Sequence, residues 1–227
     1  MESRQYSVAE QAHGVETHKV LRNTYMLLGM TLAFSALCAG LAMSMGLGRG
    51  AGLIMTIAAF VILMFVIPRT ANSAMGLPVV FLFTGLMGAA LGPMLSYYLA
   101  MPNGAELVMQ ALGGTALIFF SLSAYVLTTK KDFSFLGGFL FTGLMVVIIG
   151  AIGAMVASFF FGVDVSGIQL AISAAVVFIM SGLILFDTSR IINGGETNYI
   201  MATVSLYLNI YNLFTSLLHL LGAMNDD

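Results

Sequence analysis

Hydrophobic residues occupy this chain in seven long stretches that short polar connections separate. An α-helix needs about 20 apolar residues, with a range of about 17–25, to cross the hydrocarbon core of a bilayer. Backbone groups inside that core must be hydrogen-bonded within the segment, so the stretches are expected to be helices. Their approximate limits are 21–46, 51–67, 76–100, 105–127, 134–161, 168–188 and 200–224. The pattern predicts an all-α polytopic membrane bundle of seven transmembrane segments in one domain, residues 21–227, after a polar N-terminal tail, residues 1–20.

Composition supports lipid as the main solvent of the chain. Of the 227 residues, 59% are hydrophobic and 8% are charged, whereas a soluble domain carries roughly 25% charged residues. The mean hydropathy is +1.00. The polar first 20 residues lack the apolar core of a cleavable signal peptide. The small net charge of −2 gives no basic surface for nucleic acid.

The basic residues predict the orientation, because loops rich in Lys and Arg stay cytoplasmic. Seven of the eight fall on one side of the predicted membrane: Arg4, Lys19, Arg22, Arg69, Lys130, Lys131 and Arg190. The other side receives only Arg49. We therefore expect a cytoplasmic N-terminus and, if segment seven crosses fully, a periplasmic C-terminus. A re-entrant last segment would return the C-terminus to the cytoplasm.

Segment three contains small residues at helical spacing next to a proline. Gly88 and Gly92 form a GxxxG pattern, and Pro93 follows at once. Small residues four apart allow two membrane helices to approach closely, while proline removes one backbone hydrogen bond and bends a helix. This pattern favours a packing and kinking role over a ligand role.

Asp187 is the strongest functional candidate among the charged residues. It lies about one turn inside the cytoplasmic end of segment six, in the sequence SGLILFDTSR. Ionisable residues at such positions usually face the bundle interior and find a partner. Arg69 and Arg190 are alternative partners, and an acid that caps the helix or reaches to the membrane surface is the structural alternative.

Segment seven carries an ordered polar stripe. Ser205, Asn209, Asn212 and Ser216 follow the spacing i, i+4, i+7 and i+11, which places them on one helical face. Such a face avoids lipid, so segment seven is expected to run through the bundle interior. Interhelical hydrogen bonding is favoured over an ion path for these side chains. His219 extends the stripe and is more often an interfacial histidine.

Catalytic machinery is not visible in the sequence. There is no HExxH, GxSxG or P-loop pattern, and no two acids share a segment as a catalytic pair would. Cys38 is the single cysteine, which excludes an intrachain disulfide and disfavours a metal site. We expect a protein that is not an enzyme and has no cofactor.

Several long stretches resemble the transmembrane Bax inhibitor motif family, and specifically its bacterial YccA-like branch. The similar stretches are Gly92-Pro93-Met94-Leu95, ALGGTALIFF, THKVLRNTY, SAYVLTTKKDFSFLGG and GGETNYIMATVSLYLNIYNLF, which together cover nearly the whole chain. The resemblance implies a seven-helix fold with segment seven near the bundle centre, in the bacterial inner membrane. It also implies that the chain is a partner, slow substrate and modulator of the membrane-anchored ATP-dependent protease FtsH, which engages the cytoplasmic tail.

The same resemblance implies a second function, a pH-sensitive calcium leak. In such family members an acid on helix six and an acid on helix seven share a proton and latch a basic residue on helix two. Asp187 matches the first acid and Arg69 the latch, but Asn209 takes the place of the second acid. A carboxylate pair senses pH through like-charge repulsion, and an acid beside an amide loses that mechanism. Any leak through this chain is therefore expected to respond differently to pH.

Overall fold

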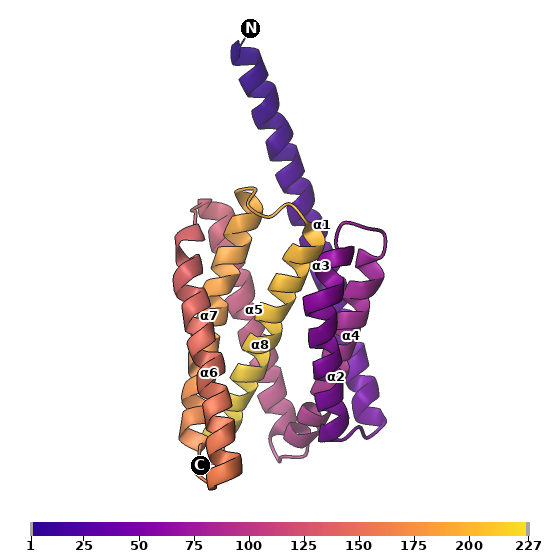
Figure 1. Ribbon diagram of the computed structural model, residues 1–227, viewed down its shortest axis with the longest axis vertical. Coiled ribbons are helices and arrows are strands. Elements are labelled where there is room, and N and C mark those ends of the chain that lie inside the picture. Colours follow the sequence, from indigo (N-terminus) through magenta and orange to yellow (C-terminus); the bar gives the residue numbers. More distant parts are fainter. Residues whose placement is uncertain (1, 226–227) are drawn as a thin grey trace. The chain divides into compact units, whose positions relative to one another are not determined.

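The computed structural model describes residues 2–225, and the side chains from residue 17 onward. Every regular element in this part is helical, which confirms the predicted all-α class. The elements are α1 (Glu2–Ser44), α2 (Arg49–Val61), the π-helical turn η1 (Ile62–Val66), α3 (Ile67–Thr70), α4 (Gly76–Leu99), α5 (Gly104–Thr129), the 3₁₀ turn η2 (Ser134–Leu136), α6 (Gly137–Phe161), α7 (Ser166–Ile192) and α8 (Tyr199–Asn225) (Figure 1).

Seven helical segments in the described part are long and apolar enough to cross a membrane, as the sequence predicts. They are Thr17–Ser44, Arg49–Thr70, Gly76–Leu99, Gly104–Thr129, Ser134–Phe161, Ser166–Ile192 and Tyr199–Asn225. The predicted limits differ from these by a few residues, because polar residues at helix ends continue the helix beyond the apolar stretch. The largest difference is at α1, which begins at Glu2 rather than near residue 21.

The second span is one helix with an irregular turn. Pro68 has no N–H to donate to the carbonyl of Met64, and the amide of Ile67 reaches back five residues to the carbonyl of Ile62. The hydroxyl of Thr70 donates to the carbonyl of Val66 at 2.9 Å, and the guanidinium of Arg69 donates to the carbonyl of Phe65. Two side chains thus add hydrogen bonds to backbone oxygens at the end of the irregular turn.

The contacts divide the chain into two compact units, which are described separately. Unit 1 comprises residues 1–102 and 191–207, and unit 2 comprises residues 103–190 and 208–227. Each unit therefore includes part of α8. Residues of α8 are among the most buried in both units, for example Leu206 in unit 1 and Leu213 and Leu218 in unit 2. This burial agrees with an interior position of the last segment.

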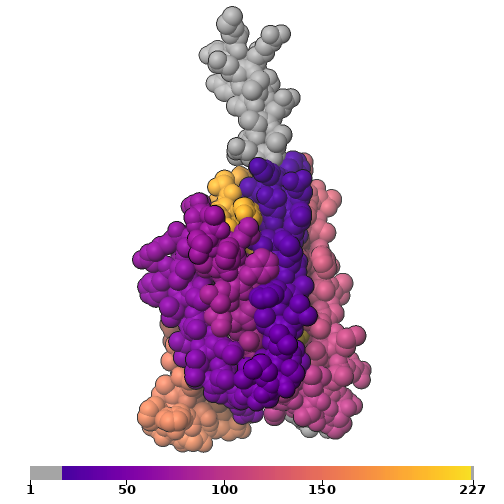
Figure 2. All heavy atoms as spheres, turned by 90° about the vertical axis from the view of Figure 1, so that its right-hand side faces the viewer, coloured from indigo at the N-terminus to yellow at the C-terminus, as the bar shows by residue number. Residues whose placement is uncertain are grey.

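In unit 1, α4 packs against α1 and α2. A Cβ added at Gly88 would lie 2.1 Å from the carbonyl oxygen of Ser35, and one added at Gly92 would lie 2.6 Å from the Cβ of Ala42. Only glycine permits α1 and α4 to approach so closely. Figure 2 shows the side chains of α1 (indigo) beside the purple side chains of α4.

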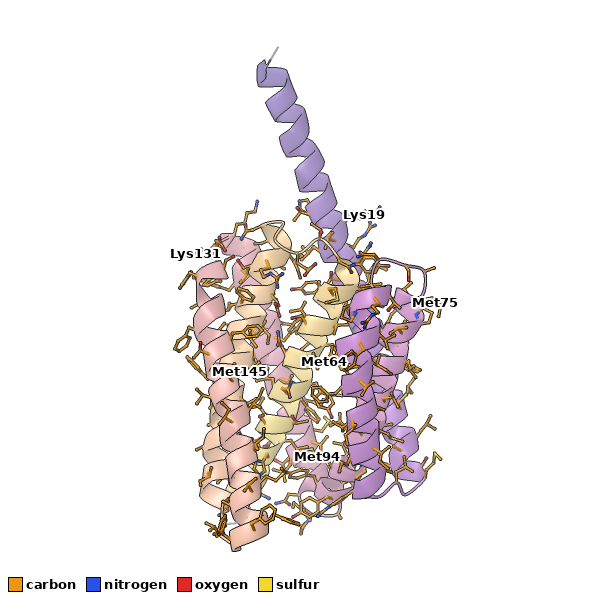
Figure 3. The ribbon with its side chains drawn as sticks, viewed as in Figure 1. Lys19, Met64, Met75, Met94, Lys131 and Met145 are labelled. Carbon is orange, nitrogen blue, oxygen red and sulfur yellow. The ribbon has the colours of Figure 1, made fainter. Side chains whose placement is uncertain are left out.

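The two ends of unit 1 can be followed in Figure 3 through three labelled residues. Figure 3 shows Lys19 near the end of the unit that also carries Met75, while Met94 lies toward the opposite end. Pro93 lies inside α4, and its ring packs against Gly52 of α2. A Cβ added at Gly52 would lie 3.3 Å from the Cγ of Pro93.

Unit 2 is built from α5, α6, α7 and the second part of α8. Close packing again depends on glycine, since a Cβ at Gly182 of α7 would lie 2.5 Å from Leu140 of α6. The most apolar window of α6 is only 6% buried, against 44% for α8. The exposed side chains of α6 are large and apolar, which is typical of a helix that faces lipid.

Candidate functional site

Asp187 lies in the interior of unit 2. Its side chain is 6% exposed, and the carboxamide of Asn209 donates from Nδ2 to Oδ2 of Asp187 at 2.7 Å. Asn209 is itself 4% exposed. The two residues belong to α7 and α8, so this contact joins two membrane helices through a carboxylate and an amide. An acid at the membrane surface, the structural alternative for Asp187, does not fit this degree of burial.

Two further buried polar residues follow Asp187 on α7. Thr188 and Ser189 are both fully buried. The hydroxyls of Thr188 and Ser123 lie 3.5 Å apart, which connects α7 to α5. Ser189 Oγ accepts the backbone N–H of Phe133 at 2.8 Å, which connects α7 to the segment before η2. Successive residues on a helix point in directions about 100° apart, so three consecutive polar side chains contact three different parts of unit 2.

Hydrogen bonds of Asp132 and Ser189 order the connection between α5 and η2. Asp132 Oδ1 accepts the backbone N–H of Ser134 at 2.8 Å and its hydroxyl at 2.6 Å, and lies 3.3 Å from Ser189 Oγ. Hydrogen bonds from the hydroxyl and the N–H of Ser134 hold the pKa of the Asp132 carboxyl below its ordinary value. Asp132 therefore stays ionised beside Lys131, whose ammonium lies 5.9 Å from the centre of the Tyr125 ring.

The members of the predicted polar stripe have different environments. Asn209 crosses to α7, whereas the carboxamide of Asn212 donates to the carbonyl of Leu208 in its own helix at 2.8 Å. Ser216 is 9% exposed, and Ser205 lies in the part of α8 that belongs to unit 1. His219 contacts α7, with Nδ1 2.8 Å from the hydroxyl of Ser173. Two of the polar side chains on this face thus make the interhelical hydrogen bonds that the sequence favours.

The two candidate basic partners of Asp187 lie in different units. Arg69 belongs to unit 1, where its guanidinium donates to the carbonyl of Phe65. Arg190 belongs to unit 2, and its guanidinium lies 5.5 Å from the centre of the Phe186 ring. A pairing of Asp187 with Arg69 or Arg190 stays a prediction.

The sequence did not single out Ser123, Thr188 and Ser189. Their signal was weak, because hydroxyl residues are common in membrane helices and bond their own backbone there, as Thr115 does to the carbonyl of Ala111. The available signal was the uninterrupted polar run Asp187-Thr188-Ser189 at the end of an apolar helix. Three consecutive side chains on a helix cannot all point to the same side, so at least one of these polar side chains must be buried.

The polar cluster of Asp187, Thr188, Ser189 and Asn209 is poorly suited to bind a cation tightly. One carboxylate and one amide supply few oxygen ligands, whereas Ca²⁺ takes 6–8. Within residues 2–225, no group of three or more His, Cys, Asp or Glu side chains is placed to hold a metal ion. The arrangement therefore fits interhelical adhesion or brief passage of an ion better than storage of one.

Comparison with known proteins gives consistent matches along the chain. Residues 17–226 match the protein family described as "Inhibitor of apoptosis-promoting Bax1". The chain belongs to this Bax inhibitor family. The family resemblance in the sequence is thereby confirmed, including its YccA-like branch.

Three relatives cover nearly the whole chain. A protein of Escherichia coli strain K12 named "Modulator of FtsH protease YccA" is 53% identical over 213 residues, 94% of each chain. A protein of Escherichia coli O6:H1 named "Inner membrane protein YccA" has the same identity and coverage. An uncharacterised protein of Pseudomonas aeruginosa is 49% identical over 231 residues, the full length of both chains. The seven spans and these relatives establish a multi-pass Bax inhibitor family protein of the inner membrane.

Proposed function

We propose that the chain binds the membrane-anchored ATP-dependent protease FtsH, is a slow substrate of it, and dampens its degradation of other membrane proteins. The observation that carries the proposal is the relative named as a modulator of FtsH, which is 53% identical over 94% of both chains. The alignment covers most of the length of both chains. This chain and its relative can therefore share a function that depends on the seven-helix architecture.

The architecture supports a substrate that resists extraction. The connections between spans are only four to six residues long, as the limits of the seven spans show. The residues before Thr17 form a longer segment outside the spans, so they offer the protease more chain to grip. The tightly packed glycine contacts of α1 against α4 oppose removal of the first span. A substrate held by one end and unfolded slowly would occupy the protease.

The test is affinity purification and turnover in cells. The tagged full-length chain is compared with a version that lacks residues 2–20, and with one in which residues 2–16 are replaced by Gly and Ser at constant length. The replacement keeps Lys19 and Arg22, so orientation is preserved. We expect FtsH to copurify with the full-length chain only, and both variants to be degraded more slowly. Unchanged turnover of both variants would sink the proposal.

A second candidate function, a calcium-permeable leak, is favoured by the buried carboxylate of Asp187. Its contact with Asn209 places a negative group inside unit 2, where it attracts a cation. The missing second acid should leave such a leak without the pH response of a carboxylate pair.

The leak is tested by calcium flux into proteoliposomes. Asp187→Asn should lower the flux about fivefold or more, because the loss of about 1 kcal/mol of attraction changes a rate by that factor. Asp132→Asn is the matched control, since it removes the same charge from a solvent-exposed connection of the same unit. Equal fluxes for all three proteins, or no flux from the parent between pH 5 and pH 8, would count against the leak.

A further inference from the structure

A hollow of about 690 Å³ lies between α6, α7 and α8 of unit 2. It opens at the end of the unit away from Lys130, Lys131 and Arg190, because it is lined by the C-terminal part of α6 and the N-terminal part of α7. Small residues of α6 create the space: Ala151 and Ala154 face it at helical spacing, with Ser158 one turn further on. Its volume is in the range of sites for small ligands, about 300–1,000 Å³.

Hydrogen-bonding groups converge on this hollow from three helices. His219 of α8 is fixed by the 2.8 Å contact between its Nδ1 and the hydroxyl of Ser173, which is 8% exposed. That contact leaves the second imidazole nitrogen, Nε2, for a ligand. The carboxamide of Gln169 and the hydroxyl of Ser158 line the same space. A purely packing role would not need polar groups around an open volume.

The charge of the lining restricts the ligand. Among the residues whose side chains the structure describes, no Lys, Arg, Asp or Glu lines the hollow, so none of these lining residues neutralises a phosphate or a carboxylate. The other walls are apolar, with Met155, Phe159 and Ile172. Since the most apolar window of α6 is only 6% buried, a ligand can enter the hollow sideways across this apolar helix. The lining therefore suits a neutral, lipid-soluble molecule whose head accepts hydrogen bonds.

We propose that this hollow binds a neutral membrane lipid of the quinone class. The ring carbonyl oxygens would accept hydrogen bonds from Gln169 and His219, and the ring would lie against Phe159, whose aromatic face suits a flat ring. The apolar tail would leave between α6 and the lipid. A quinone head brings two acceptors and no charge, which matches the donors and the neutral lining.

The absence of tryptophan from the chain makes the site measurable. Phe159→Trp gives a single fluorophore at the rim of the hollow, where the side chain is 81% exposed, and Phe178→Trp gives a comparably exposed fluorophore on α7, 67% exposed, that does not line the hollow. Full-length protein in phosphatidylcholine nanodiscs is titrated with decylubiquinone, which quenches tryptophan. We expect a saturable component in the quenching of Phe159→Trp, added to the linear response from quinone in the bilayer, and a linear response alone from Phe178→Trp.

Second substitutions in the Phe159→Trp protein identify the contacts. Gln169→Leu and His219→Leu should each raise the half-saturating concentration about three- to tenfold, the effect of one lost hydrogen bond. Ala151→Leu, an exposed position that keeps all polar groups, should do the same by filling the space. Excess decylbenzene, which has the tail but no carbonyl, should not compete.

Three results would overturn the proposal. Linear quenching at both tryptophans would mean partition into the bilayer only. Saturation that none of the three substitutions changes would place the quinone outside the hollow. Competition by decylbenzene would mean that the hollow binds hydrocarbon and that hydrogen bonds to the carbonyl oxygens do not contribute to binding.

Discussion

The contact of Asp187 with Asn209 shows how one residue decides the cost of a buried acid. Taking a carboxylate out of water costs several kcal/mol unless hydrogen bonds compensate it. Asn209 supplies such a bond at 2.7 Å from a neighbouring helix. An amide offers a donor without adding a second negative charge, so the pair is stable without a shared proton. The carboxamide of Asn209 thus helps unit 2 to bury Asp187.

This role predicts a strong difference between two asparagines on the same face of α8. Asn209→Leu should lower the free energy of unfolding by about 1.5–3 kcal/mol, the value of a hydrogen bond to a charged group. Asn212→Leu, the matched control, should lower it by less than about 1 kcal/mol, because Asn212 bonds the carbonyl of Leu208 in its own helix. Denaturant unfolding of the purified proteins in mild detergent measures both values.

Asp187→Asn completes the measurement. In this background Asn209→Leu should cost less than it does in the parent, since there is then no carboxylate to lose the hydrogen bond from Asn209. Equal losses at positions 209 and 212, or the same cost of Asn209→Leu with and without Asp187, would show that the hydrogen bond is not what stabilises α7 against α8.

At the scale of elements, glycine and proline determine how the helices of unit 1 meet. Gly88 and Gly92 bring α4 against α1, and Gly52 brings α2 against Pro93. In lipid, helices gain little from burying apolar surface, so close contact and interhelical hydrogen bonds must hold them together. The hydrogen bond between Ser35 Oγ and Tyr207 OH, 2.7 Å, adds such a contact beside Gly88. Packing in unit 1 therefore depends on a few small residues.

The seven spans were predictable because a bilayer imposes length and hydrophobicity on every crossing. The π-helical turn in the second span was not, since Pro68 marks an irregularity without saying whether a kink, a π turn or a helix end results. The contact of Asp187 with Asn209 was implied by the family resemblance, but residue spacing alone could not give it. Spacing placed Asn209 on the inner face of α8, but only the relative rotation of α7 and α8 decides that Asn209, rather than Asn212, reaches the carboxylate.

At the scale of the whole molecule, the distribution of charge predicts the orientation. Seven of eight basic residues precede or follow the predicted spans on one side, and only Arg49 lies on the other. This bias predicts that the N-terminus lies in the cytoplasm. An odd number of full crossings would then put the C-terminus outside. The side on which the C-terminus lies depends on whether α8 crosses the membrane fully or turns back.

The dimensions of α8 favour a full crossing. It is a continuous helix of 27 residues, about 40 Å long at 1.5 Å per residue, against a hydrocarbon core of about 30 Å. A re-entrant segment needs a break in the helix, and α8 has none between Tyr199 and Asn225.

Alkaline phosphatase fused after the C-terminus should therefore be active, because its disulfides form only outside the cytoplasm. Phosphatase inserted after Lys130 should be inactive, and phosphatase inserted after Asp164 should be active. A green fluorescent protein fused to the C-terminus should stay dark when exported unfolded. A fluorescent C-terminal fusion with an inactive phosphatase would mean that α8 returns to the cytoplasmic side, and the predicted orientation of the last span would be wrong.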